Sequence, residues 1–205
     1  MALLHRKEHN LTESLYTVSS SLGNTKLIVG LGNVGDKYDL TRHNIGFYCL
    51  DTLLQAEGGT WSEKKTLKSL IADIHIGTTR LILCKPTTFM NLSGEAVRAV
   101  QQYFKISNAD TIVIHDDLDV QFGQIRTRIG GGSAGNNGIK SLLAHIDEDF
   151  GRIRIGIANE FSDKIDSADF VLQKFSKTEQ EQLKALSNEV ISITNDAVFG
   201  GQLLA

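Results

Sequence analysis

The chain has 205 residues, 41% of them hydrophobic and 22% charged, a size and composition typical of one globular domain that buries a hydrophobic core. No run approaches the roughly 18 to 20 apolar residues of a membrane helix, and the first residues turn polar too soon for a secretory signal, so we expect a cytoplasmic protein with no membrane partner. A formal net charge of −3 argues against nucleic-acid binding over the whole surface, so any RNA contact must be local.

The N-terminal quarter predicts a tail, a strand and a helix. Residues 1–25 are rich in Ser, Thr, Asn and charge without a sustained period, which predicts a flexible or loosely docked tail ahead of one domain over residues 26–205. The apolar run Leu27–Val29 ends in glycines, as expected for a strand buried on both faces. Apolar residues recur at helical spacing over Phe47–Leu54, so a glycine-rich loop joins the predicted strand to a predicted helix.

The middle of the chain predicts a hairpin, a helix and a strand. Apolar residues mostly alternate in Leu70–Ile76, and Gly77-Thr-Thr separates this segment from Arg80–Lys85. Ser93 is placed to cap the following helix. The apolar face of that helix is predicted to be Ala96, Val97, Val100, Tyr103 and Phe104. The run Thr111–His115 predicts the next strand, and Asp116, Asp117 and Asp119 follow at its end.

The remaining elements complete the expected fold class. Alternation over Gln124–Ile129 places Arg126 and Arg128 on one face of a strand. After a glycine-rich loop, a helix is predicted over Ile139–Ile146, then a strand over Arg152–Ile157, and the capping box Ser176–Glu179 precedes a terminal amphipathic helix. Strands that alternate with helices predict an α/β fold, a single-domain three-layer sandwich with a mixed, mostly parallel twisted sheet flanked by helices.

The segment Gly30–Gly35 matches GxGxxG, the dinucleotide-binding fingerprint, and alone would favour an NAD-binding enzyme. However, a helix should begin at the third glycine, whereas the residues after Gly35 show no apolar face before Ile45. Asp51, the acid nearest the expected ribose position, falls within a helical pattern instead of at a strand end. We therefore expect no nucleotide cofactor.

The segment Gly131–Gly135 matches GxSxG, the motif around the nucleophile of many serine esterases. In that fold an acid and then a histidine follow the serine, but only His145 follows Ser133, with no acid between them. The loop is also long where a nucleophile elbow is a tight turn. Ser133 is therefore interpreted as a small polar residue of a flexible loop.

A third set of residues lies just past strand ends or at helix starts, where α/β sheets bind ligands. The set consists of Asn33, Tyr38, His43, Phe89, Met90, Asn91, Asp116 and Asn137. The segments that contain it resemble, in order and spacing, the signature blocks of bacterial-type peptidyl-tRNA hydrolases. These segments are Gly30–Gly35 with Thr41–Asn44, Lys85–Gly94, His115–Asp119 and Gly130–Gly138.

The resemblance runs from Lys26 to the C-terminal helix and implies hydrolysis of the ester that joins a peptide to tRNA. It implies tRNA as the partner, a monomer, and no metal or other cofactor. The residues agree with that chemistry, because activating water near neutral pH suits an imidazole. His43 is the expected general base, and Asp116 is expected to hold its tautomer and stabilise the imidazolium.

The resemblance also implies binding roles. The asparagine matching Asn33 helps to distinguish peptidyl-tRNA from unblocked aminoacyl-tRNA, and those matching Asn91 and Asn137 bind substrate near the ester. Tyr38 and Phe89, with Met90 beside them, offer surfaces to the terminal adenosine or the peptide. Arg128 and Arg154 match basic positions expected to contact tRNA phosphates.

Some alternatives and departures remain open. A non-catalytic RNA-binding relative could keep the same surface. A metal at His115–Asp119 is the weaker reading, because neighbouring strand residues point to opposite faces. Val34 replaces a usual proline, Asn136 a frequent histidine and Asn159-Glu160 a glycine- and proline-containing turn, and the C-terminus lacks the usual basic segment. These departures bear on tRNA affinity and loop geometry more than on the reaction.

Overall fold

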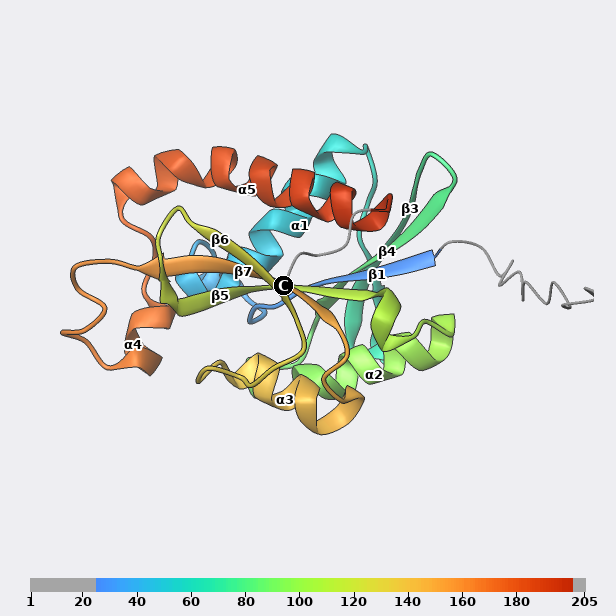
Figure 1. Ribbon diagram of the computed structural model, residues 1–205, viewed down its shortest axis with the longest axis horizontal. Coiled ribbons are helices and arrows are strands. Elements are labelled where there is room, and N and C mark those ends of the chain that lie inside the picture. Colours follow the sequence, from blue (N-terminus) through green and yellow to red (C-terminus); the bar gives the residue numbers. More distant parts are fainter. Residues whose placement is uncertain (1–24, 201–205) are drawn as a thin grey trace, which may run out of the picture.

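The computed structural model describes residues 25–200, so residues 1–24 of the predicted N-terminal tail lie outside the described residues, whereas Thr25 belongs to the first strand and not to the tail. A single seven-stranded sheet forms the middle layer, with helices on both faces (Figure 1). Its strands, in the spatial order β2-β3-β4-β1-β5-β7-β6, are β1 Thr25–Gly30, β2 Ser62–Lys64, β3 Ser69–Ile76, β4 Thr79–Pro86, β5 Thr111–Gln121, β6 Ile125–Ile129 and β7 Gly151–Ala158. The central strands β4, β1, β5 and β7 are parallel, and β3 and β6 pair antiparallel to this core. The predicted mixed, mostly parallel sheet is confirmed.

The helices divide between the two faces of the sheet. They are α1 Ile45–Ala56, α2 Ser93–Phe104, α3 Asn137–Ile146, α4 Ser167–Leu172 and α5 Lys177–Val198. Figure 1 shows α1 and α5 above the sheet and α2 and α3 below it. Because side chains of a strand alternate between faces, Leu27 and Val29 pack with the α2/α3 side while Ile28 packs with the α1/α5 side. None of the helices in residues 25–200 is long and apolar enough to cross a membrane.

Helix α1 packs closely on the central strands because two glycines face each other. A Cβ at Gly30 would clash with the carbonyl group of Gly46, and one at Gly46 would clash with backbone oxygens of Leu31 and Ile114. This contact brings the turn before α1 over the carboxyl ends of β1 and β5. Gly30 of the GxGxxG segment therefore serves helix packing.

Three local predictions were wrong. Strand β5 continues to Gln121, because β7 pairs with it through Asp117 and again at Gln121, so Asp116 and Asp119 lie within a strand and not beyond its end. Ser93 makes no cap hydrogen bond, since a 3-10 turn, η4 (Met90–Leu92), leads straight into α2. Tyr103 is 68% exposed although it was placed on the apolar face.

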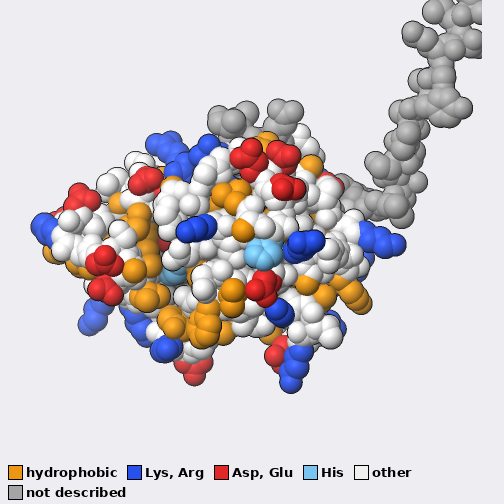
Figure 2. Space-filling view, turned by 90° about the horizontal axis from the view of Figure 1, so that it is seen from below, with side chains coloured by type: hydrophobic (Ala, Val, Ile, Leu, Met, Phe, Trp, Pro, Cys, Tyr) orange, Lys and Arg blue, Asp and Glu red, His pale blue; other side chains and the backbone are white. Residues whose placement is uncertain are grey.

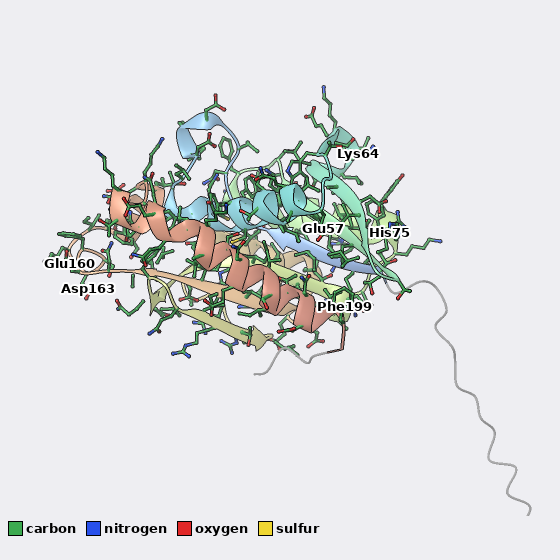
Figure 3. All side chains as sticks on the ribbon, turned by 90° about the horizontal axis from the view of Figure 1, so that it is seen from above. Glu57, Lys64, His75, Glu160, Asp163 and Phe199 are labelled. Atoms are coloured by element: carbon green, nitrogen blue, oxygen red, sulfur yellow. The ribbon has the colours of Figure 1, made fainter. Side chains whose placement is uncertain are left out.

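The start of α5 is as predicted. The Ser176 hydroxyl accepts from the Glu179 N–H, and the Glu179 carboxylate accepts from the Ser176 N–H. This reciprocal arrangement satisfies two backbone donors that a helix start otherwise leaves unpaired. Figure 3 shows the loop after β7, with Glu160 and Asp163, at the end of the molecule where α5 begins, and Phe199 at the opposite end of this helix.

Candidate active site

His43 and Asp116 form a buried pair at the carboxyl ends of the parallel strands. His43 lies in the 3-10 turn η2 (Arg42–Asn44), directly before α1, and Asp116 belongs to β5. The His43 Nδ1 atom lies 2.9 Å from both carboxylate oxygens of Asp116. Both side chains are buried, at 6% and 3% exposure, so bulk water does not compete for this contact. The pair is 73 positions apart in sequence and is assembled by the approach of α1 to β5.

Two opposed effects set the proton affinity of His43. Burial lowers the pKa of its imidazole, but the charge of Asp116 and the hydrogen bond to it outweigh burial and raise the pKa above its ordinary value. Burial alone would raise the pKa of the Asp116 carboxyl, and the opposing attraction of His43 leaves that pKa lowered. The geometry therefore favours a charged carboxylate that orients the imidazole through Nδ1 and leaves Nε2 for chemistry.

A cavity of about 400 Å³ opens beside this pair. Its walls come from the end of β5, the glycine-rich loop with the start of α3, and α4. The residues that border it include His43, Asp116, Asp119, Asn137, Asp166 and Val171. The structure thus brings together three of the predicted site residues, His43, Asp116 and Asn137, and adds α4, which no sequence pattern indicated.

Asn33 is fixed by three hydrogen bonds. Its backbone N–H donates to Asn44 Oδ1 at 2.9 Å, and its carbonyl oxygen accepts from Asn44 Nδ2 at 2.8 Å. Its side-chain oxygen accepts from the Met90 N–H at 3.0 Å. Within residues 25–200 the Asn33 Nδ2 group has no hydrogen-bond partner, which leaves its two N–H donors for a ligand. Asn33 borders a second cavity of about 470 Å³, together with Phe47 and Lys85.

Two residues of the site were missed by the sequence reasoning. Asn44 binds the backbone of Asn33. The sequence indicated Asn44 only by its place next to His43, in a segment that resembles the family. Asn136 caps α3 by accepting from the N–H groups of Gly138 and Ile139, and its Nδ2 donates to Asp116 Oδ1 at 3.1 Å. An asparagine two residues before a helical glycine is a cap signal, but its second bond depends on tertiary structure.

The other predicted binding residues differ in exposure. Phe89 is 57% exposed, and Asn91 and Asn137 are exposed. Met90 is buried in the core under α3, and its backbone N–H holds Asn33. Tyr38, at the end of the turn η1 (Asp36–Tyr38), is half-buried beneath the Lys37 ammonium and does not border either cavity.

Four arginines lie on one face of β6 and β7. Arg126 is opposite Arg154, and Arg128 is opposite Arg152. Arg152 is buried and donates to the carbonyl oxygens of Gly131 and Gly132. Burial, then the charges of Arg128 and Arg154, lower the Arg152 pKa to about 10. Since like charges placed opposite one another destabilise a sheet, this group is suited to a bound anion.

Acidic partners limit the positive charge of this face. Arg154 Nε donates to Asp117 Oδ2 at 2.7 Å, whereas Arg126 and Arg128 are without an ion-pair partner among the described residues. Figure 2, which views the molecule from the α2/α3 side, shows Lys and Arg side chains spread over the face and its rim among acidic ones. The basic side chains of this face are therefore interspersed with acidic ones.

The alternative chemistries lack the contacts they need. His145 Nδ1 is bonded to the Ser141 carbonyl oxygen of its own helix, so it is not oriented by an acid toward Ser133. Asp116 and Asp117 have separate partners, His43 and Arg154. Within residues 25–200 no three His, Cys, Asp or Glu side chains are grouped so as to hold a metal ion.

Cys49 and Cys84 are buried and form no disulfide with each other. Burial raises the pKa of each thiol to about 12.

Comparison with known proteins gives one consistent family. The family model described as peptidyl-tRNA hydrolase matches residues 27–202. The peptidyl-tRNA hydrolase of Ligilactobacillus salivarius is 42% identical over 77% of this chain and 84% of its own length. That of a Sulfurovum species is 44% identical over 80% and 84%. The crystal structure of peptidyl-tRNA hydrolase from Acinetobacter baumannii has a TM-score of 0.79 at 34% identity, over 87% of this chain and 91% of that one.

Proposed function

Because this chain belongs to the peptidyl-tRNA hydrolase family, we propose that it hydrolyses the ester bond between peptide and tRNA, with His43 as the base that activates water. The observation that carries the proposal is the buried His43–Asp116 pair beside an open cavity. With Nδ1 directed to the Asp116 carboxylate, the Nε2 atom is the one that accepts a proton.

The reaction needs no group beyond the side chains described. His43 Nε2 takes a proton from water as the water oxygen attacks the ester carbonyl carbon. The tetrahedral intermediate then breaks its bond to the ribose oxygen, which receives the proton from His43 and leaves as free tRNA. Asp116 stabilises the imidazolium between these steps. Asn137, an uncharged donor that borders the same cavity, is suited to bind the substrate near the ester.

Asn33 is proposed to read the acyl end of the substrate. Its oxygen is held by the Met90 N–H, so its Nδ2 group is left to donate to a peptide carbonyl. Phe89 and Asn91, which precede and follow Met90 in the sequence, are both exposed. They would contact the ribose, base or peptide.

Binding of the tRNA body is proposed to rest on Arg128 and Arg154, with Arg126 beside them. Phosphate oxygens accept bidentate bonds from arginine and relieve the repulsion within the group. One chain supplies the base, the acid and the amides, so we propose that the enzyme acts as a monomer. Because the substrate is produced by translation, we propose that the enzyme acts in the cytoplasm.

Replacement of His43 by alanine tests the function. We expect His43→Ala to lower the turnover of N-acetyl-aminoacyl-tRNA by about 10² to 10⁴, the usual contribution of a general base. Thermal unfolding and circular dichroism of the variant serve as the folding control. Wild-type turnover by the folded variant would exclude His43 as the base, and no turnover by the wild-type protein would favour a non-catalytic RNA-binding relative.

A further inference from the structure

The turn that carries His43 is fastened to the start of α5 by its neighbour Arg42. The Arg42 Nη2 atom donates to Glu179 Oε2 at 3.0 Å, across 137 positions of sequence. The Arg42 backbone N–H donates to the Gln173 carbonyl oxygen at 3.0 Å, and Thr41 forms an antiparallel bridge with Lys174. The position of the His43 turn therefore depends on the segment between α4 and α5.

Glu179 joins three parts of the chain through one carboxylate. Besides Arg42, its Oε2 accepts from the Ser176 N–H at 2.7 Å, which is half of the capping box. Its Oε1 accepts from Asn159 Nδ2 at 2.9 Å, in the loop after β7. Arg42 and Glu179 are both buried, at 4% and 8% exposure. Arg42 Nη1 also donates to the Lys174 carbonyl oxygen at 3.1 Å, but removal of either charge leaves the other buried without its ionic partner, which favours rearrangement of the surrounding chain.

The same guanidinium also supports a wall of the His43 cavity. The Arg42 Cζ atom lies 4.3 Å from the ring centre of Phe170, in α4. Other residues of α4, Ser167 and Val171, border the cavity together with His43. A shift of Arg42 would thus move both the base and the α4 wall of the cavity.

From this geometry we infer that Glu179 is a positioning residue. Through Arg42 it holds the Arg42–Asn44 turn so that His43 Nδ1 stays within hydrogen-bonding distance of the Asp116 carboxylate. The inference rests on the proposed role of His43 as the base. Neither Arg42 nor Glu179 borders the cavity, so neither contacts the reacting atoms in this account. Besides Asp116, the charged groups that border this cavity are Asp117 and Asp119 from β5 and Asp166 ahead of α4, and the Glu179→Gln substitution changes the charge of none of them.

The test is Glu179→Gln, which keeps the length of the side chain and an oxygen for the Ser176 N–H but removes the charge that holds Arg42. We expect kcat for N-acetyl-aminoacyl-tRNA to fall roughly tenfold, because small displacements of a base slow the chemical step, with KM changed by less than about twofold. The His43 pKa, read by NMR of the imidazole, should fall in the same variant. Both a weaker contact with Asp116 and an unpaired Arg42 charge disfavour the imidazolium.

A matched control separates positioning from stability. Leu186→Ala removes a core side chain from the same helix and should lower the melting temperature without moving kcat or the His43 pKa. If Glu179→Gln does not fold, Asn159→Ala removes one bond to Glu179 from a half-buried residue and should lower kcat about twofold to threefold, with a smaller fall in the His43 pKa.

Two results would overturn the inference. The first is a folded Glu179→Gln variant, or Asn159→Ala in its place, that keeps the kcat and the His43 pKa of the parent. The second is a change of kcat and His43 pKa in Leu186→Ala as large as that in Glu179→Gln. Failure of the proposed function would look different. In that case the wild-type protein would show no turnover, or His43→Ala would retain it, whatever happens at Glu179.

Discussion

At the scale of single residues, the site depends on neutral amides held by backbone groups around one charged pair. Asn33 has no freedom to rotate, because Met90 binds its oxygen and Asn44 binds its backbone. Its remaining donor therefore has a fixed direction. A site that offers a donor to a neutral amide disfavours a ligand that brings an ammonium instead, since buried polar groups are then left unpaired.

We predict that Asn33→Asp loses activity on peptidyl-tRNA while its relative activity on unblocked aminoacyl-tRNA rises. The new carboxylate still accepts from the Met90 N–H, so the loop is retained, but the amide donor is replaced by a charge that attracts an ammonium. The ratio of kcat/KM for the two substrates measures this change. An unchanged ratio would reduce Asn33 to a structural role in the turn.

At the scale of elements, the periodic segments could be predicted from the sequence and the short ones could not. Burial on one face imposes a period on helices such as α3 and α5, and on strands such as β7, and these were found. Strand β2 has three exposed residues and α4 has six residues, too few to show a period.

The contacts within the candidate site also could not be predicted from local sequence patterns. His43 and Asp116 could be paired beforehand only through the resemblance, because their contact is made by packing of α1 on β5. The bonds from Asn136 to Asp116 and from Arg42 to Glu179 join segments that are far apart in the sequence, and no local pattern encodes them.

Asn136 permits a prediction that separates helix capping from chemistry. Asn136→Ala should lower the free energy of unfolding by about 1 kcal/mol, the usual value of an N-cap, and also lower kcat because Asp116 loses a donor. Asn136→Ser keeps a capping oxygen but does not replace the donor to Asp116. We therefore expect serine to restore stability in denaturant titrations but not kcat; recovery of both would show that Asn136 acts on the helix alone.

At the scale of the whole molecule, a net negative protein has to bind a polyanion through a small region. The arginines of β6 and β7 form that region, and their neighbours make them unequal. Arg152 is buried and holds the glycine-rich loop, Arg154 is paired with buried Asp117, and Arg128 is free of an ion pair among the described residues. Replacement of Arg128 therefore tests phosphate binding without breaking an ion pair within the described residues.

We predict that Arg128→Ala raises KM for full-length peptidyl-tRNA, more so at low salt, and lowers the salt slope of binding by about 0.9 for each lost phosphate contact. A short CCA-peptidyl fragment should be less affected. Arg154→Ala should do the same and also lose stability, because Asp117 is left unpaired. Arg80→Ala, in the β3–β4 hairpin, is the control for loss of one positive charge. Equal losses on fragment and whole tRNA would place these arginines at the chemistry instead.

The pH dependence of kcat/KM, measured for the wild-type protein and for Asp116→Asn, tests the central claim most directly. A general base acts when unprotonated, so activity should rise as pH increases through the His43 pKa. Burial lowers that pKa and Asp116 raises it by more, so the wild-type midpoint should lie above about 6.5, the ordinary value for histidine. In Asp116→Asn only burial remains, and the midpoint should fall below that value, with a lower maximal rate. A midpoint that stays in place or moves upward in Asp116→Asn would contradict the assignment of His43 and Asp116 as the catalytic pair.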